Sequence, residues 1–441
     1  MPRKKLKVAL FHLAFVYSGG GERLVLKEAQ ELSRLGYDVT CFAPVIDKKK
    51  CFPELMGEVK VEKILPKLLP SWFPDNTLFS ILAACLFTPF FFYKFRDYDV
   101  YFGANQPGPW IAYLLSKINK KPYVIYLAQP TRLIHPRLVD QQVGLKINDG
   151  FSLLYFVSFL LKPFIYVADV KSIRNADVVF SNGSYMTGVL KDVYRINPIN
   201  CPAGADASRA ISVVDRKNKF HGNISLNGNS IAKPYLLVTN RHFAQKKFEY
   251  AIEALKFLSS DVQLVIAGEP TEYTKELQKK YVSEKKHITF VGLLSESELD
   301  KAYAYAAVYL YPAPEEDFGM GIIEAMAHGT PVVAWGNAGP SGIITHGEDG
   351  FLAKPFDVGN FAKHVNRLLQ NKALYQEIVD SAYENIEESF TYENHVRIIS
   401  IKIKQSIVQW RAKEKKARVN VKQEQRLRII AIPKWGKTHV S

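Results

Sequence analysis

Two glutamates flank a glycine-containing turn in the second half of the chain. Glu316 and Glu324 stand eight residues apart within YPAPEEDFGMGIIEAMAHGTPVVAW, residues 311–335. Carboxylates suit the hydroxyls of a sugar or a ribose, because each can accept charge-assisted hydrogen bonds from a diol. Gly319 and Gly321 lie between them, where the free N–H groups of a helix start can hold a diphosphate. The pattern predicts a site for a phosphorylated sugar; the alternative is that acidic residues only offset the helix dipole.

The elements that must position this turn are a strand, a helix and a second strand. The β-branched and aromatic run Val308 to Tyr311 predicts a strand that stops before Pro312. Helical spacing from Ile322 to Ala327 ends at Gly329, and Pro331 to Trp335 predicts the next strand. Strand, turn, helix and strand in this order form one unit of an α/β sheet.

A second glycine-rich loop lies near the start of the chain. Lys7 to Leu13 predicts a buried strand, and YSGGGER then leads into a predicted helix from Leu24 to Leu35. Gly20 and Gly21 would let the backbone approach a ligand at the end of that strand, where open α/β sheets bind phosphates. The loop lacks the full dinucleotide fingerprint, so no nicotinamide cofactor is expected.

Several motifs in order resemble one enzyme family. EEDFGMGIIEAMAHGTPVVA, then Gly339-Pro340, then HGEDGFLAKPFD (His346 to Asp357) resemble the signature of the family 4 retaining glycosyltransferases, and further pieces recur from about Lys7 to about Gln405. The resemblance implies an α/β protein with the GT-B fold, in which two Rossmann-like domains with parallel sheets face each other across a cleft. A chain of 441 residues with 47% hydrophobic content can bury two such cores.

The same resemblance implies a domain plan with four parts. We expect an N-terminal, acceptor-side Rossmann-like domain in residues 1–206 and a polar linker or loop in 207–233. A C-terminal, nucleotide-sugar-binding Rossmann-like domain would follow in 234–388. Residues 389–441 would form a terminal helix that returns to the N-terminal domain, followed by a basic tail.

Site residues follow from the resemblance as well. Arg241 and Lys246 resemble the basic pair that neutralises the donor diphosphate, and fixed cations stabilise the charge that develops on such a leaving group. Glu316 would bind the sugar hydroxyls, so the expected catalytic residues are Glu316, Arg241 and Lys246. The sequence does not decide between Lys246 and Lys247. No metal is expected, because no DxD motif stands on a suitable loop. The expected donor-binding set is Gly20, Gly21, Lys247, Phe318, Gly319, Met320, Gly321 and Glu324, with Glu324 on the ribose.

One position departs from the family pattern. Family members commonly have a histidine close to the donor sugar where this chain has Ala128, after the predicted strand Tyr123 to Leu127. His135 lies seven residues further on, but a lone histidine is more often structural. We do not expect His135 to be catalytic.

The expected activity is transfer of a sugar with retention of configuration. The GGGER loop and the EEDFGMG turn look most like mannosyltransferases, so GDP-mannose is the expected donor and a lipid-linked glycan or cell-surface polysaccharide precursor the expected acceptor. Two alternatives stay open. One is another GT-B enzyme, such as a nucleotide-sugar epimerase, which needs no acceptor; the other is a non-catalytic, membrane-associated binding protein.

Two apolar stretches and a basic tail favour attachment to a membrane surface. Leu78 to Tyr93 is short for a bilayer span and contains Pro89, and Phe151 to Val167 repeats the pattern with Pro163. They would lie in one leaflet or be buried helices of the N-terminal domain. The chain has a net charge of +15, and residues 401–441 carry a net charge of +10. Such a basic tail is suited to an anionic membrane surface. The alternative is a solvated, disordered extension. Nucleic acid is not an expected partner.

The cysteines and the N-terminus indicate the compartment. Cys41, Cys51, Cys85 and Cys201 show no paired spacing, so reduced thiols in the cytosol are expected. No cleavable signal peptide precedes the first predicted strand. The sequence therefore predicts a cytoplasmic protein that is peripheral on the cytoplasmic face of the membrane.

Overall fold

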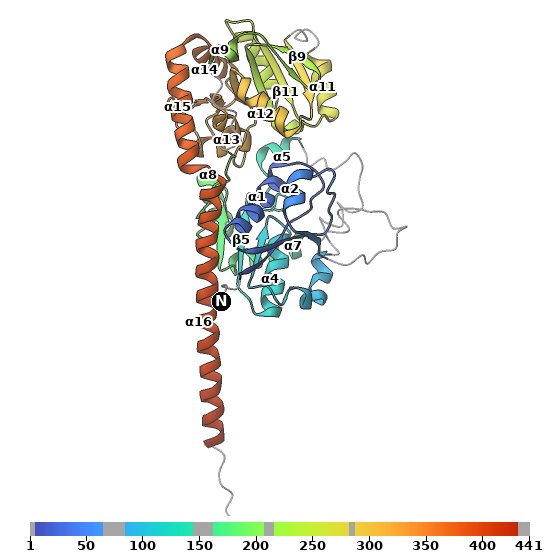
Figure 1. Cartoon of the computed structure of the whole chain (residues 1–441), viewed down its shortest axis with the longest axis vertical. Helices are drawn as coiled ribbons and strands as arrows, with labels where there is room; N and C mark the ends of the chain where they lie inside the picture. The colour runs from blue at the N-terminus through green and yellow to red at the C-terminus, as the bar shows by residue number, and fades with distance from the viewer. Residues whose placement is uncertain (1–4, 65–83, 144–161, 207–215, 282–286, 431–441) are drawn as a thin grey trace, which may run out of the picture.

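The computed structural model describes residues 5–64, 84–143, 162–206, 216–281 and 287–430. Two parallel sheets lie one beyond the other along the molecule (Figure 1). We call the part built on the first sheet the N-terminal domain and the part built on the second sheet the C-terminal domain. The α/β fold with two facing parallel sheets that the sequence predicts is confirmed.

The N-terminal domain has seven strands in the order β3-β2-β1-β4-β5-β6-β7. Helices cover both faces of the sheet, so the residues of strand β1 after Lys7 are fully buried and the strand is apolar throughout instead of alternating. The strands are β1 Lys7–Phe11, β2 Asp38–Ala43, β3 Val61–Lys63, β4 Val100–Ala104, β5 Tyr123–Leu127, β6 Val178–Ser181 and β7 Ile199–Asn200. The helices are α1 Gly20–Arg34, α2 Pro53–Glu58, the 3-10 helix η1 Thr88–Phe95, α4 Gly108–Asn119, α5 Leu138–Val143, α7 Lys162–Arg174 and α8 Gly183–Tyr194.

The C-terminal domain has six strands in the order β12-β11-β10-β13-β14-β15. Its strands are β10 Tyr235–Thr239, β11 Gln263–Ala267, β12 Ile288–Gly292, β13 Val308–Tyr311, β14 Val332–Trp335 and β15 Phe351–Ala353. The predicted strand Val308 to Tyr311 has the same bounds as β13. The helices are η3 Ala244–Lys246, α10 Glu249–Ala254, η4 Leu255–Phe257, α11 Glu272–Lys280, α12 Glu296–Tyr305, α13 Met320–Ala327, η6 Gly339–Gly342, α14 Val358–Gln370 and α15 Lys372–Ser389.

The segment expected to be a linker or loop, 207–233, is instead folded over most of its described part. It contains helix α9 (Arg216–Phe220) and an antiparallel hairpin of β8 (Asn223–Leu226) and β9 (Asn229–Ala232). The hairpin turns at Asn227-Gly228, where both residues have positive φ, as a two-residue type I′ turn requires. Leu226 and Ile231 are fully buried, and the hairpin packs on β11 and α12. Residues 216–232 therefore belong structurally to the C-terminal domain.

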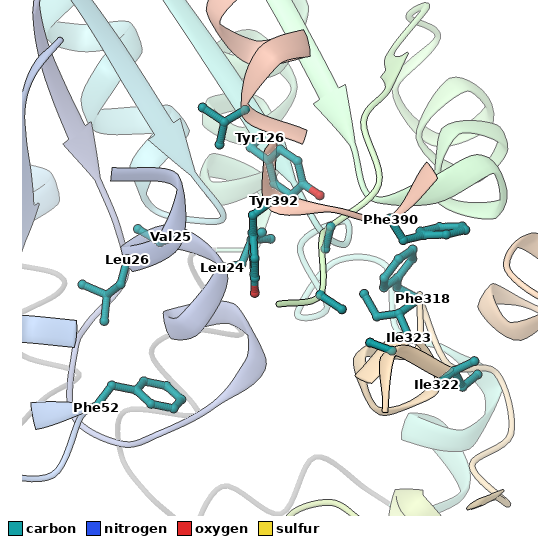
Figure 2. Packing of buried hydrophobic residues seen from close by; sticks show 14 of the residues in the cluster. Leu24, Val25, Leu26, Phe52, Tyr126, Phe318, Ile322, Ile323, Phe390 and Tyr392 are labelled. Atoms are coloured by element: carbon teal, nitrogen blue, oxygen red, sulfur yellow. The ribbon is translucent and has the colours of Figure 1, made fainter. Parts of the chain in front are cut away.

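The chain crosses between the domains at two places that lie side by side. Ala205 and Thr391 form a β-bridge. Gly204 is needed here, because a Cβ at this position would lie 2.2 Å from the backbone nitrogen of Tyr392. Around these crossings, apolar side chains of both domains pack together, with Phe318 against Phe390 (Figure 2). The crossings thus form a tightly packed connection between the domains.

The last helix is longer than predicted. Helical spacing predicts a helix that ends near Gln409 and is followed by a basic tail, whereas α16 runs without interruption from Tyr392 to Ile430. At 1.5 Å per residue it is about 58 Å long. It packs on α1, β5 and β6 and then projects past the N-terminal domain (Figure 1). Residues 410–430 are therefore helical and not a disordered extension, and residues 431–441 lie outside the described part.

Only parts of the two apolar stretches are described. Residues 78–83 and 151–161 lie outside the described residues. The remaining parts belong to the helical turn before η1, to η1 itself and to α7, and several of their aromatic side chains are exposed. The described parts of both stretches are therefore only partly buried. No helix in the described ranges is both long enough and apolar enough to cross a bilayer.

Candidate active site

A cleft of about 730 Å³ lies between the two domains. Its walls come from the loops that follow strands β1, β4 and β5 on one side and β10, β11 and β13 on the other. All of these strands are parallel within their sheets, so their carboxyl ends converge on the same cleft, the usual place for ligands in open α/β sheets.

The two glycine turns singled out in the sequence face each other across this cleft. Helix α1 begins at Gly20 with Gly19 as its N-cap, and helix α13 begins at Met320 with Gly319 as its N-cap. A Cβ at Gly20 would lie 3.4 Å from the side chain of Met320, whereas one at Gly21 would point into open space. The helix starts of both domains therefore line the cleft together.

The turn before α13 has the geometry of an anion-binding helix start. Gly319 has a φ of 117°, which favours glycine, and its neighbours Phe318, Met320 and Gly321 also line the cleft. Gly321 is glycine for a packing reason, since a Cβ there would lie 2.2 Å from the hydroxyl of Tyr309. Because α13 begins at Met320, Glu324 lies in its second turn.

Lys246 and Glu316 form an ion pair on the C-terminal wall of the cleft. Lys246 ends the 3-10 helix η3, and Glu316 belongs to the turn between β13 and α13. Burial alone would raise the pKa of Glu316, but Lys246 and then Arg137 outweigh it and hold that pKa at about 2. The predicted diphosphate cation and the predicted sugar carboxylate are therefore in direct contact.

Lys247 has a different environment from Lys246. Its backbone is left-handed, with a φ of 50°, and its ammonium group lies 3.6 Å from Glu249. Lys246 is among the described residues that line the cleft, and Lys247 is not. The structure thus separates the two lysines that the sequence could not distinguish and does not bring Lys247 to the predicted donor site.

Arg241 is held between aromatic rings of both domains. Its guanidinium lies 4.2 Å from the ring centroid of Tyr17 in the N-terminal domain and 4.7 Å from that of Phe243. Its Nε is 3.1 Å from a carboxylate oxygen of Glu269. A guanidinium over an aromatic face is attracted to the ring quadrupole. Tyr17 therefore helps to keep Arg241 pointed at the cleft from the opposite wall.

Glu324 is oriented by a chain of hydroxyl groups. The hydroxyl of Tyr303 donates to Glu324 at 2.8 Å and lies 2.7 Å from the hydroxyl oxygen of Thr239. Burial raises the pKa of Glu324, and Arg23, 3.9 Å away from the N-terminal side of the cleft, opposes that increase. Arg23 also pairs with Glu296 at 2.6 Å. Glu324 is thus fixed in the cleft wall by groups from both domains.

Several cleft residues were missed in the sequence. His12 lies at the end of β1, with Nδ1 3.3 Å from the carbonyl oxygen of Ala104 and Nε2 3.9 Å from Glu22. That Nε2 is buried and has no hydrogen-bond partner among the described residues. Glu22 and Arg23 stand inside the GGGER motif, so attention to its charged residues could have found them. Tyr303 and His12 carry no comparable signal.

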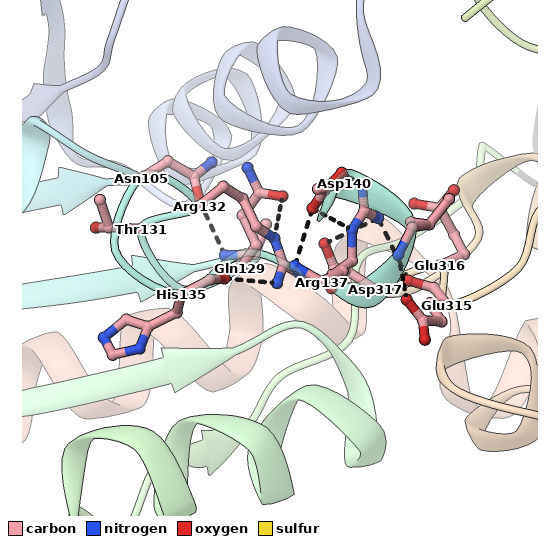
Figure 3. Close-up of polar contacts among 12 residues, drawn as sticks. Asn105, Gln129, Thr131, Arg132, His135, Arg137, Asp140, Glu315, Glu316 and Asp317 are labelled. Atoms are coloured by element: carbon pink, nitrogen blue, oxygen red, sulfur yellow. Dashed lines mark hydrogen bonds and ion pairs between the residues drawn. The ribbon is translucent and has the colours of Figure 1, made fainter. Parts of the chain in front are cut away.

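Ala128, which stands where family members commonly have a histidine, lies in the cleft wall. Its N–H donates to the side chain of Asn105 at 2.9 Å. His135 does not replace a cleft histidine. Its ring packs on Tyr194 and Tyr166, and Figure 3 shows it turned away from the other labelled polar side chains. Burial lowers the pKa of His135, which suits a structural role.

Two facing parallel sheets with a ligand-sized cleft between their carboxyl ends define the GT-B class of proteins. Residues 227–385 match the family described as "Glycosyl transferases group 1". Most of the C-terminal domain is therefore similar to this glycosyltransferase family.

Individual relatives extend this likeness. The chain is 22% identical over 431 residues to the alpha-1,3/1,6-mannosyltransferase ALG2 of Dictyostelium discoideum, covering 88% of this chain and 96% of that protein. It is 26% identical over 180 residues to the 2-deoxystreptamine N-acetyl-D-glucosaminyltransferase of Niallia circulans, covering 39% of this chain and 46% of that enzyme. This chain spans less than half of the length of several of the curated relatives it matches. The crystal structure of Anabaena HepE in complex with UDP and glucose has the same fold, with a TM-score of 0.66, 18% identity and coverage of 91% and 100%.

Proposed function

We propose that the protein is a retaining glycosyltransferase that moves mannose from GDP-mannose to a hydroxyl of a lipid-linked or cell-surface glycan. The observation that carries this proposal is that Arg241, Lys246, Glu316, Glu324 and the start of α13 line one cleft. The choice of mannose is supported by the similarity to alpha-1,3/1,6-mannosyltransferases from several organisms over most of this chain.

In this proposal the donor lies along the C-terminal wall of the cleft. Its diphosphate is bound by Arg241, by Lys246 and by the first N–H groups of α13, which together present positive charge. Glu324 accepts hydrogen bonds from the ribose, and Glu316 from the sugar hydroxyls. Lys246 then divides its contacts between Glu316 and the diphosphate, since both are anionic.

The chemistry follows from this placement. The bond between the sugar C1 and the phosphate oxygen breaks, and the leaving diphosphate gains negative charge that Arg241 and Lys246 stabilise. The acceptor hydroxyl attacks C1 from the face that the phosphate leaves and gives its proton to a phosphate oxygen. The configuration at C1 is retained, and no step requires a covalent intermediate on the protein.

We further propose that the N-terminal domain rests on an anionic membrane surface. Phe90 of η1 is 72% exposed and Phe164 of α7 is 74% exposed, and both elements pack against the same helix, α4. More exposed apolar residues follow from the same two segments: Leu86, Phe87, Phe92, Tyr93, Tyr166 and Val167. Exposed aromatic rings beside basic residues are suited to the boundary between lipid headgroups and acyl chains.

Basic residues lie beside this apolar surface. The side chain of Asn119 donates to the carbonyl oxygen of Phe92, which places the end of α4, with the exposed Lys117 and Lys120, next to the aromatic run. Helix α16 passes the same end of the domain, where Trp410 lies 5.6 Å from the ammonium group of Lys121. Each well-placed basic residue adds about 1 kcal/mol of attraction to an anionic surface. These contacts support a peripheral position on the cytoplasmic membrane face.

A donor panel tests the proposed activity. Thermal unfolding is followed with GDP-, UDP- and ADP-sugars, and turnover of the best ligand is then measured with and without lipid-linked acceptors. We expect the largest increase in Tm with GDP-mannose and mannose transfer only when an acceptor is present. Conversion of the donor sugar without an acceptor would indicate an epimerase, and binding without turnover in any mixture would indicate a non-catalytic protein.

A further inference from the structure

One segment of the N-terminal domain reaches across the cleft to the C-terminal domain. After β5 the chain runs through residues 128–137 into the short helix α5, which contacts η3, the 3-10 helix that ends at Lys246. In Figure 1, α5 lies at the boundary between the two domains. This segment is therefore placed beside the proposed donor-sugar site.

Two arginines of this segment hold the acidic turn that contains Glu316. Arg132 forms an ion pair with Asp317, and their side chains are only 15% and 11% exposed. Arg137 donates to both carboxylate oxygens of Asp140 at 2.9 Å, which fixes its guanidinium plane. The fixed group then lies 3.7 Å from Asp317 and donates to the carbonyl oxygen of Glu315 at 3.3 Å.

Glu315 is held from the same side. Its carboxylate accepts a hydrogen bond from the backbone N–H of Val139 at 3.0 Å, and its backbone is left-handed with a φ of 51°. A non-glycine residue adopts this conformation only where its surroundings impose it. Both sequence neighbours of Glu316 are thus fixed by the N-terminal domain, as the converging contacts in Figure 3 show.

Glu316 lies between these two anchored residues and points to Lys246. Within the C-terminal domain, the N–H of Gly339 donates to the carbonyl oxygen of Glu316 at 2.8 Å. The backbone on either side of Glu316 is held in addition by the N-terminal domain, so the direction of its carboxylate depends in part on contacts that exist only while the domains are together. Arg137 also contributes to the low pKa of Glu316. Buried charge pairs of this kind are retained in some proteins because they specify one arrangement.

We propose that Arg132 and Arg137 are positioning residues that place Glu316 for the donor sugar only when the two domains are closed. This inference rests on the proposed role of Glu316. The two guanidinium groups form an interdomain clamp with Glu315 and Asp317. Opening of the domains releases residues 315–317, so the sugar carboxylate is misplaced and the donor is not turned over; closure restores it.

Activity of substituted full-length protein tests the clamp. Arg132→Ala, Arg137→Ala and Asp317→Asn are compared with Arg34→Ala, a mostly exposed arginine of α1, as a matched control. We expect kcat to fall at least tenfold in the three clamp variants, while the affinity for GDP, which lacks the sugar, changes less than threefold. Arg132→Lys should recover part of the loss, because it keeps the charge but not the planar fork. Arg34→Ala should match the wild type.

Three results of the activity and affinity measurements would overturn the proposal. They are an unchanged kcat in Arg132→Ala and Asp317→Asn, an equal loss of GDP affinity and kcat, or additive effects when these two substitutions are combined. Small-angle scattering supplies a readout that needs no activity: the Arg132→Ala/Arg137→Ala double variant should have a larger radius of gyration than the wild type, and an equal radius would contradict the clamp. If the wild type transfers no sugar, the proposed function fails, and scattering still decides the clamp.

Discussion

The ammonium group of Lys246 contacts the carboxylate of Glu316 in the wall of the interdomain cleft. The two residues come from different loops of the C-terminal domain, η3 and the turn before α13. The sequence assigns them to different parts of a donor, the diphosphate and the sugar. Because the two side chains are in contact, a single donor molecule could reach both of them.

Replacement of Lys246 tests the charge that this pair supplies. We expect Lys246→Ala to lower kcat/KM by about 10² to 10³, because loss of one group that stabilises developing negative charge has an effect of this size. Lys247→Ala is the matched control, since its side chain pairs with Glu249 outside the cleft, and it should retain activity within about threefold. Steady-state kinetics measure both. A larger loss in Lys247→Ala than in Lys246→Ala would reverse the assignment.

Glu316→Gln should remove most of the activity without unfolding the protein. The amide cannot accept two charge-assisted hydrogen bonds from a sugar diol, so we expect kcat to fall by about 10². Circular dichroism and Tm establish that the variant is folded. Wild-type activity in a folded Glu316→Gln variant would exclude the proposed sugar contact.

The depressed pKa of Glu316 also predicts a pH dependence of stability. Its pKa is about 2 in the folded protein against an ordinary value of 4.5. A group with a lowered folded pKa stabilises the protein above its unfolded pKa, and that contribution is lost as the pH falls from about 4.5 towards 2. The contribution is on the order of 3 kcal/mol. Denaturant titrations should show a steeper loss of stability in this window for the wild type than for Glu316→Gln, and equal slopes would contradict the pKa.

The sequence predicts the fold and the cleft loops well because these features have local signals. Buried parallel strands give continuous apolar runs, and glycine turns mark helix starts, so β5, β13 and both glycine loops are found at or near their observed positions. The hairpin at 223–232 was missed because its strands are short and polar, although Asn227-Gly228 carries a type I′ signal.

Contacts between the domains could not be predicted from spacing. Tyr17 over Arg241, Arg23 beside Glu324 and Arg132 on Asp317 each join residues far apart in the sequence. Residue type likewise cannot separate Lys246, which lines the cleft, from Lys247, which pairs with Glu249. The sequence predicts too early an end for α16, because a change from apolar to basic composition marks a change of environment and not a helix end.

A buried histidine should make the docking of α16 sensitive to alkaline pH. His395 lies 3.0 Å from Glu28 of α1, and both are fully buried. Burial would lower the pKa of His395, but Cys201 and Glu28 raise it to about 10. The stabilisation is complete below the ordinary value of 6.5 and is lost as the pH rises through about 10. We expect His395→Gln to lower the unfolding free energy by about 3 kcal/mol at pH 7 and to flatten its decline between pH 7 and 10. The unfolding free energies of the wild type and of His395→Gln are measured by denaturant titration at each pH. An equal decline of the two free energies between pH 7 and 10 would contradict this prediction.

The exposed aromatic surface predicts membrane binding that depends on specific side chains. Phe90→Ser combined with Phe164→Ser should weaken partitioning to vesicles that contain anionic lipid by more than tenfold, since each buried aromatic contributes about 1.5 to 3 kcal/mol. Phe257→Ser is the control, because Phe257 is 57% exposed but belongs to the C-terminal domain. Vesicle co-sedimentation at low and high salt measures the effect. Equal partitioning of the wild type, the double variant and Phe257→Ser would exclude this surface as the membrane-binding site.

The most direct test of the account is calorimetric titration of GDP into the wild type, Arg241→Ala, Lys246→Ala and Lys247→Ala. We propose that one diphosphate is held by Arg241 and Lys246, after β10, and by the start of α13, all of which line the cleft. We expect GDP to bind the wild type, with affinities at least tenfold weaker in Arg241→Ala and Lys246→Ala and an affinity within threefold of the wild type in Lys247→Ala. Equal binding by all four proteins, or no binding of GDP to the wild type, would contradict this proposal.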